Sequence, residues 1–182
     1  MHAHRSTISR ATCAIAALVF AGCAGLTQPA SGPVTATAEL RNAQGQPVGN
    51  ATLSEVGGGV RVIVEARRLP PGVKGVHIHA VGKCDPPEFT TAGGHFNPTN
   101  KKHGLESPDG PHAGDLPNIT IAADGNGRLE SMNERITLGS GGNSLLDADG
   151  SAVVIHAAPD DFKTDPTGNS GGRIACGVVI KR

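Results

Sequence analysis

Residues 81–116 form one long stretch that shows neither the alternation of a β-strand nor the period of an α-helix. Glycine and proline, of which the chain has 26 and 13, are frequent in this stretch. In a compact domain, a loop of this length is usually functional or is held by something other than a hydrophobic core. The fold must therefore frame a long irregular segment, which we expect to carry the function.

The segments on both sides of this loop are short and alternate small or apolar residues with polar ones. The clearest is 60–67, VRVIVEAR, and no segment has a convincing helical period. We predict the other strands at 34–41, 51–56, 75–80, 118–123, 127–138, 152–157 and 173–181. Seven or eight short strands joined by turns predict an antiparallel sandwich or a Greek-key barrel.

Composition limits both the core and the partners of the protein. A chain of 182 residues predicts one domain, and with four Phe and no Trp or Tyr its core must consist of Val, Ile, Leu and Ala. The 16 basic and 16 acidic residues give a formal charge of zero, so the positive surface of a nucleic-acid-binding protein is missing. Aromatic residues for base stacking are scarce as well. We therefore expect no nucleic-acid partner.

Residues 1–22 have the order of a secretory signal, with Arg5 and Arg10 before an apolar run and small residues at its end. The run is too short to span a bilayer. Residues 20–23, Phe-Ala-Gly-Cys, resemble the lipobox of bacterial lipoproteins, in which cleavage before the cysteine is coupled to acylation of its thiol. We expect residues 1–22 to be removed and Cys23 to carry lipid; an ordinary secretory signal with an incidental cysteine is the alternative.

The residues after this signal extend the prediction. Residues 23–33 would be the lipidated cysteine and a small, polar, flexible tether to a domain at 34–182. The protein would then be exported to the bacterial cell envelope, face the periplasm or the exterior, and contact the membrane through its lipid anchor only. Cys84 and Cys176 remain in this oxidising compartment, which predicts one disulfide; two buried free thiols are the alternative.

Two histidines lie in the predicted strand at 75–80. Because the side chains of a strand alternate between its faces, His77 and His79 project to one side and Ile78 projects to the other. Two neutral imidazoles on one side can share a metal ion. Alone, this pattern is weak evidence, because it also fits two hydrogen-bonded or surface histidines.

The irregular stretch adds His95, His103 and His112, followed by Asp115. Three imidazoles and a carboxylate from one loop suit a tetrahedral zinc site that is closed to solvent. A histidine-rich, solvated loop is the alternative. His156 ends an apolar run, where a lone histidine is normally a hydrogen-bonded core residue, but it is also the only histidine left to complete a nitrogen site with the pair in the strand.

Five runs resemble the copper/zinc superoxide dismutases in order and in ligand spacing: GVHIHAVGKC, AGGHFNPTNKKHG, PHAGDLPNI, VIHAAPDD and GNSGGRIACGVV. The resemblance covers residues 34–182 and is densest at 75–115 and 152–179. It implies an all-β, eight-stranded antiparallel Greek-key barrel, with the architecture of an immunoglobulin-like sandwich and long metal-binding loops. It also implies dismutation of superoxide to dioxygen and hydrogen peroxide, which would protect the cell envelope.

The resemblance implies one copper, cycling between Cu(II) and Cu(I), and one structural Zn(II) per subunit. Four histidines match the copper ligands: His77, His79, His95 and His156. Three histidines and an aspartate match the zinc ligands: His95, His103, His112 and Asp115. His95 would bridge the two metals and take part in catalysis with Arg173, which matches the arginine beside the copper. Asp160 matches the carboxylate that links ligand histidines of the two metals, and Cys84 and Cys176 match the family disulfide.

The resemblance leaves the oligomeric state open, because bacterial members include monomers and homodimers. The loop 161–167 is short, and Lys163 is the only candidate counterpart of the charged residues that guide superoxide in eukaryotic members.

A non-catalytic lipoprotein that buffers copper or zinc would have the same ligands but no role for Arg173. A blue-copper electron carrier would need a cysteine thiolate and an axial methionine, but Met132 lies far from the histidine motifs.

Overall fold

A computed structural model of the chain describes residues 1–2 and 33–182. Nearly all of the predicted signal and tether, Cys23 included, lies outside the described residues, so these predictions remain expectations. The described residues contain no helix that is long and apolar enough to cross a membrane.

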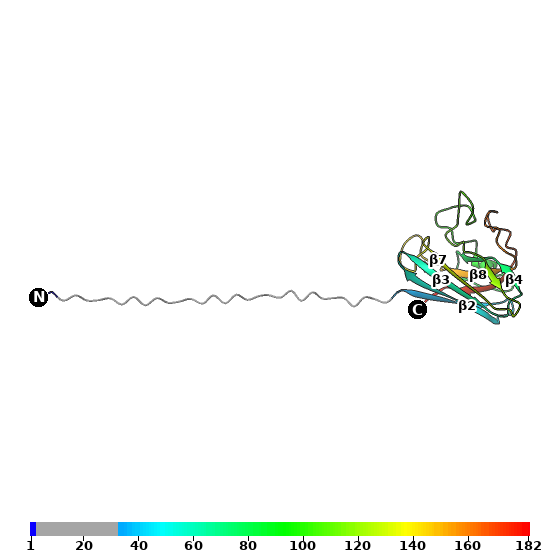
Figure 1. The fold of residues 1–182 in the computed structure, drawn as a ribbon, viewed down its shortest axis with the longest axis horizontal. Helices are drawn as coiled ribbons and strands as arrows, with labels where there is room; N and C mark the ends of the chain where they lie inside the picture. Colours follow the sequence, from blue (N-terminus) through cyan, green and yellow to red (C-terminus); the bar gives the residue numbers. More distant parts are fainter. Residues whose placement is uncertain (3–32) are drawn as a thin grey trace. The chain divides into compact units, whose positions relative to one another are not determined.

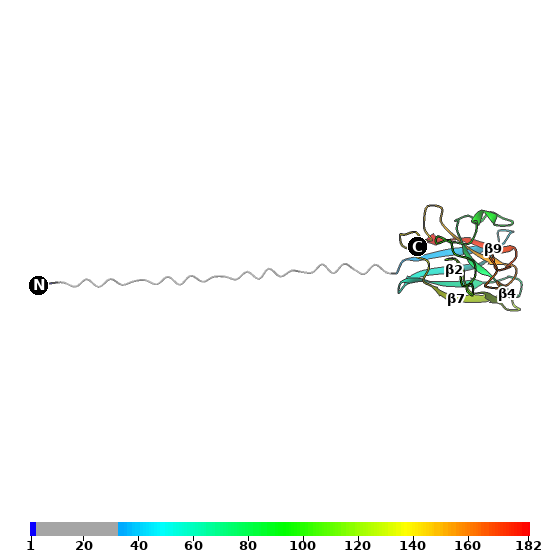
Figure 2. The same ribbon diagram turned by 90° about the horizontal axis from the view of Figure 1, so that it is seen from above.

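The described residues form ten strands and one short 3-10 helix, η1. In chain order the elements are β1 (Thr35–Arg41), β2 (Pro47–Val56), β3 (Gly59–Ala66), β4 (Gly72–Lys74), β5 (Val76–His79), η1 (Thr90–Ala92), β6 (Ile119–Ile121), β7 (Gly127–Asn133), β8 (Ala152–His156), β9 (Arg173–Val178) and β10 (Ile180–Lys181). Figure 1 shows two long loops, coloured green and brown, on the same side of the strands. Figure 2 shows β2 between β9 and β7.

The sheet closes on itself. The strand order is β4-β6-β7-β3-β2-β1-β9-β8-β5, so β4 and β5 stand at its two ends. These two segments are one run of chain, interrupted only at Gly75, and they pair antiparallel with β6 and with β8. In the same way Val179 alone separates β9 from β10. The ten segments are therefore the eight strands of the predicted antiparallel barrel, and the predicted fold class is confirmed.

The barrel interior follows from the alternation in the sequence. In β3, Val60, Val62 and Val64 are fully buried, whereas Arg61 and Glu65, at alternate positions of the same strand, are exposed. The main core consists of Val, Ile, Leu and Ala, as predicted, with Phe96 from the long loop added to it. A second, smaller cluster of buried residues contains Phe89 and Cys176, and Cys84, the disulfide partner of Cys176, packs against it. The predicted disulfide is thus confirmed.

Three details of the strands differ from the prediction. The strand expected at 51–56 begins earlier, at Pro47. The strand expected at 127–138 ends at Asn133, which still pairs with Val60 and whose buried side chain bonds backbone groups outside the ladder. Asn133 donates to the carbonyl oxygen of Ala113 at 2.8 Å and accepts from the backbone N–H of Arg135 at 3.0 Å. The short β4 was not expected, and its three residues carry too little alternation to be recognised.

The long loop is tied to β5 by backbone hydrogen bonds. Ile78 donates to the carbonyl of Gly114 at 2.9 Å and accepts from Phe96 at 2.8 Å, and Gly114 donates to the carbonyl of Phe96 at 2.8 Å. A Cβ atom at Gly114 would overlap the carbonyl oxygen of Ile78, so only glycine permits this close approach. The strand that carries two of the histidines therefore also positions the loop that carries three more.

Candidate metal centre

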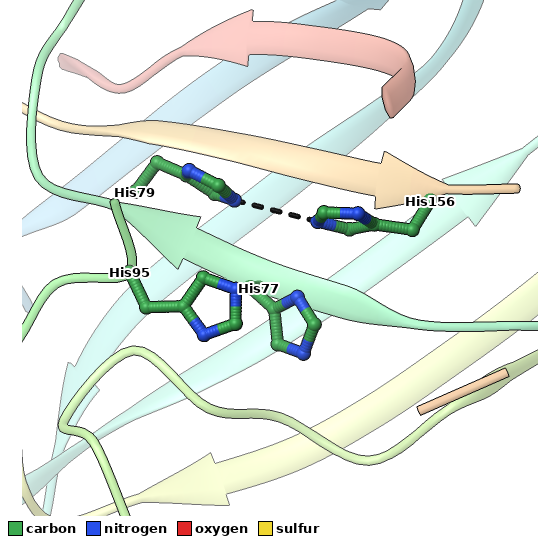
Figure 3. A group of neighbouring side chains, drawn as sticks. All are labelled: His77, His79, His95 and His156. Atoms are coloured by element: carbon green, nitrogen blue, oxygen red, sulfur yellow. Dashed lines mark hydrogen bonds between the residues drawn. The ribbon is translucent and has the colours of Figure 1, made fainter. Parts of the chain in front are cut away.

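Four imidazoles meet beside β5. Figure 3 shows His77 and His79 from β5, His156 from the end of β8 and His95 from the long loop. All are buried, and one ring nitrogen from each lies within 4.8 Å of the others. The Nε2 atoms of His79 and His156 are 3.4 Å apart. The structure therefore brings together the residues expected to bind copper, including the histidine on β8 that is distant in sequence.

The second ring nitrogen of three of these histidines has a hydrogen-bond acceptor. The contacts are His77 Nε2 to Asp160 Oδ2 at 2.6 Å, His79 Nδ1 to the carbonyl of Gly93 at 2.9 Å, and His156 Nδ1 to the carbonyl of Gly171 at 3.1 Å. A nitrogen that donates to an oxygen carries the proton, so the other nitrogen of each neutral ring presents a lone pair. Those lone pairs belong to Nδ1 of His77 and to Nε2 of His79 and His156.

Two buried ring nitrogens of these four histidines have no hydrogen-bond partner among the described residues. They are Nδ1 of His77 and Nε2 of His95. A buried acceptor without a partner costs free energy, and native structures normally satisfy it. A metal ion that accepts these lone pairs would satisfy them. The donor set of four imidazoles suits copper.

A second group of donors surrounds Asp115. Its Oδ1 atom lies 2.9 Å from Nδ1 of His95, 3.1 Å from Nδ1 of His103 and 3.4 Å from Nδ1 of His112. Its Oδ2 atom accepts from the backbone N–H groups of Gly104 and His112, each at 2.9 Å. Zinc bonds of about 2.0 Å in a tetrahedron place donors about 3.3 Å apart. The distances from Asp115 to the three rings and the buried N₃O donor set fit zinc. His95, His103 and Asp115 also belong to a group whose ligand atoms all lie within 4.8 Å of one another; its fourth member is His77, and His112 lies outside it.

His95 belongs to both groups. Its Nδ1 atom faces Asp115, and its Nε2 atom is the partnerless nitrogen on the side of the four imidazoles. Its ring stacks on that of His77 with 3.8 Å between the centroids. One imidazole therefore offers a donor atom to each site.

Asp160 links the two groups through the nitrogens that face away from the donor atoms. Its Oδ2 atom contacts Nε2 of His77 at 2.6 Å, and its Oδ1 atom contacts Nε2 of His103 at 3.0 Å. Asn118 holds the backbone of Asp160, donating to its carbonyl and accepting from its N–H at 2.9 Å each. Such contacts set the tautomer and orientation of ligand histidines. Sequence reasoning missed this role of Asn118, although the residue lies in a matched run.

Sequence reasoning also missed Asp165. Its Oδ1 atom accepts from the backbone N–H of His103 at 2.7 Å and lies 3.8 Å from Nε2 of His112. Lys102 is paired with the same carboxylate at 3.4 Å. The short loop 161–167 therefore reaches the long loop and supports it. Lys163, the expected counterpart of guiding charges, instead pairs with Glu106 at 3.0 Å, and both side chains are exposed.

Residues 47–179 match the family described as copper/zinc superoxide dismutase (SODC). The chain belongs to this family. Superoxide dismutase (Cu-Zn) 1 of Aquifex aeolicus is 52% identical over 144 residues, covering 78% of this chain and 85% of the relative. Superoxide dismutase (Cu-Zn) of Caulobacter vibrioides is 44% identical over 148 residues, covering 80% and 85%. A crystal structure of a SOD-like protein from Bacillus subtilis, 41% identical, has a TM-score of 0.75 and covers 79% of this chain and 97% of that one.

Copper and zinc are the cofactors of this copper/zinc superoxide dismutase. An open cavity of about 410 Å³ reaches His79 and His156, and Arg173 lines it. The guanidinium of Arg173 donates to the carbonyls of Phe89 and Gly93 at 2.6 Å each. Burial lowers its pKa, yet an arginine remains charged at neutral pH. The dismutase thus has a fixed positive charge at the open side of the four imidazoles.

Burial keeps most of the clustered imidazoles neutral. It lowers the pKa of His77, and it is the main cause that lowers the pKa of His79 to about 2, of His156 to about 3 and of His95 to about 4. His103 is the exception. Burial acts to lower its pKa, but hydrogen bonds to Asp115 and Asp160 outweigh burial and raise the pKa to about 9. Neutral imidazole is the form that binds a metal ion.

We expect the metal-free dismutase to lose stability as the pH falls from about 7.5 to about 5. Below the ordinary histidine pKa of 6.5, unfolded chains bind protons at His79, His95 and His156 that the folded protein does not accept until its own pKa values of about 2, 4 and 3. Each lowers the free energy of unfolding by about 2 kcal/mol at pH 5. His103 with its raised pKa offsets part of this, and His77 with its lowered pKa adds to it, so the net loss should be at least about 4 kcal/mol.

Urea denaturation of the metal-free protein at both pH values measures this difference. Return to the higher pH should restore the original midpoint, which controls for irreversible damage. Equal free energies of unfolding at the two values would show that the buried imidazoles are not held neutral.

Proposed function

We propose that this dismutase works in the bacterial cell envelope with copper held by His77, His79, His95 and His156 and zinc held by His95, His103, His112 and Asp115. The observation that carries the ligand assignment is the sharing of His95, whose two ring nitrogens face the two donor groups. Each donor set matches the ligand preference of its metal: four imidazoles suit copper, and three imidazoles with a carboxylate suit zinc.

The reaction converts two superoxide anions and two protons into one dioxygen and one hydrogen peroxide. Bound copper supplies one-electron chemistry by alternating between Cu(II) and Cu(I). Nε2 of His95 is buried beside the other three imidazoles, where it can hold one of the two protons between half-reactions. The second proton enters from solvent through the cavity that reaches His79 and His156. Zinc keeps one oxidation state, so its ligands serve to hold the loop and the ring of His95.

Arg173 is proposed to attract and orient the anion. Its guanidinium is held by two backbone carbonyls rather than by a carboxylate, so its charge is not neutralised by an ion pair within the described residues. It lines the same cavity as His79 and His156. A local positive charge in a cleft raises the rate at which a small anion arrives. A protein that only stores metal would have no use for this arrangement.

The envelope location is proposed from the pattern at residues 20–23 and from the disulfide. Disulfides persist in oxidising compartments, and Cys84 is bonded to Cys176. The chain would be anchored by lipid on Cys23 and would remove superoxide outside the cytoplasm.

The two metals should be separable by mutation. Asp115→Ala removes the oxygen that lies against three imidazoles, so zinc affinity should fall by more than about 100-fold while copper is partly retained. His156→Ala is the matched control and should lose copper while keeping zinc. Both variants would be equilibrated with equimolar copper and zinc and their metal content counted. Full zinc occupancy in Asp115→Ala would refute the assignment.

Replacing Arg173 should slow the reaction without loss of metal. Arg173→Ala should lower the second-order rate constant with superoxide about tenfold, and the difference should shrink as salt rises because ions already screen the wild type. Lys163→Gln, the control, should change the rate less than about twofold, since Lys163 is exposed and paired with Glu106.

Pulse radiolysis at matched copper content and several ionic strengths gives these rates. Equal rates and equal salt dependence for Arg173→Ala and wild type would remove this residue from the mechanism. Full metal content with no superoxide removal in the wild type would favour a metal-buffering lipoprotein.

The anchor prediction concerns the mature N-terminus. Protein purified from a bacterial host with lipoprotein processing should begin at Cys23, carry the mass of the attached acyl chains and fractionate with membranes. Cys23→Ser should be exported but not lipidated, and should leave the membrane fraction. An unmodified Cys23, or cleavage at another position, would contradict the proposal.

A further inference from the structure

A second cavity, of about 520 Å³, lies between the long loop and the turn around Asn143. Pro98 and Pro111 come from the loop, and Ala113 and Arg135 also line the cavity. None of its lining residues lines the cavity that contains Arg173. Its volume is in the range of small-molecule sites, and its walls are mainly apolar.

Arg135 contributes an incompletely paired cation to this cavity. The side chain is half-buried, one Nη atom donates to the backbone carbonyl of Asp115 at 3.1 Å, and the buried Nε atom has no partner. The carboxylates of Asp115 and Glu134 attract it electrostatically, but no carboxylate of residues 33–182 forms a direct ion pair with it. Removing a guanidinium from water without a counter-charge is costly, and natural sites usually supply an anion.

Lys101 adds a second positive charge, and no acidic side chain lines the cavity. Lys101 is exposed and forms no ion pair within the part of the chain that is described, unlike its neighbour Lys102, which pairs with Asp165 at 3.4 Å. The amide of Asn143 donates to the carbonyl of Arg135 at 3.3 Å, so this wall is fixed by a polar contact. The cavity thus combines two cations with apolar walls.

We propose that this cavity binds a small organic carboxylate, with the anionic group on Arg135 and an apolar body between Pro98 and Pro111. A planar guanidinium matches a carboxylate in geometry as well as in charge. Lys101 at the edge adds attraction for the same group. The site is separate from the copper cavity and does not depend on the proposed ligand assignments.

Benzoate is a suitable probe, because it joins one carboxylate to a compact apolar ring, and benzamide is its neutral counterpart of the same shape. The dismutase with zinc bound and copper kept as Cu(I) would be titrated with each at constant ionic strength. Backbone amide shifts in ¹H–¹⁵N spectra would be followed. Benzoate should shift the amides of Gly110, Ala113 and Asn143 with a Kd below about 10 mM, and benzamide should bind at least tenfold more weakly.

Three single substitutions measure how much each cation contributes to benzoate binding. Arg135→Met should weaken benzoate binding at least tenfold, Lys101→Gln should weaken it about threefold, and the neighbouring Lys102→Gln should leave it unchanged. Benzoate and benzamide can be compared on the unchanged protein, so the test stands even if Arg135→Met does not fold.

Three results would overturn the proposal. They are the absence of shifts at these amides, equal binding of benzamide, or the same Kd in Arg135→Met as in the wild type. An acidic peptide that shifts these amides when benzoate does not would also overturn it, because the occupant would then be a protein segment.

Discussion

Two buried carboxylates hold the clustered imidazoles in place. Asp115 contacts the ring nitrogens of His95 and His103 at 2.9 and 3.1 Å, and Asp160 contacts His77 and His103 at 2.6 and 3.0 Å. Each carboxylate therefore joins residues that the chain supplies from distant positions. The Asp160 contacts set the orientation of the His77 and His103 rings through the nitrogens opposite the donor atoms, whereas the Asp115 contacts bring the proposed zinc donors together, so that the donor atoms are already close before a metal ion binds.

This arrangement explains how a long loop without regular structure can be part of a rigid site. Its backbone is bonded to Ile78 in β5, and the disulfide from Cys84 to Cys176 ties its first part to β9. The barrel supplies the fixed reference, because Val76–His79 pairs with β8 along its whole length. A bound metal would add to these restraints, since metal binding to residues of one loop contributes directly to its folding free energy.

The site needs neutral imidazoles to bind metal and a positive charge to attract an anion, and the surroundings of each residue decide which form it takes. The imidazoles near the open cavity are neutral because burial disfavours their charged forms, and Arg173 supplies the charge that a small anion needs. His103, between two carboxylates, has a raised pKa instead. Neighbouring histidines of one chain thus differ by several pKa units because each one faces a different set of partners.

The sequence by itself determined the strands with clear alternation, the residue types of the core, the disulfide and, through the spacing of the histidine runs, the set of candidate ligands. Only the tertiary structure decided that β4 and β5 close the barrel across Gly75 and that β7 ends at Asn133. It also decided that Asn118 clamps Asp160 and that Arg135 faces a cavity without a counter-charge. The physical reason is that alternation and spacing are local properties, whereas the partner of a buried polar group is set by how distant segments pack.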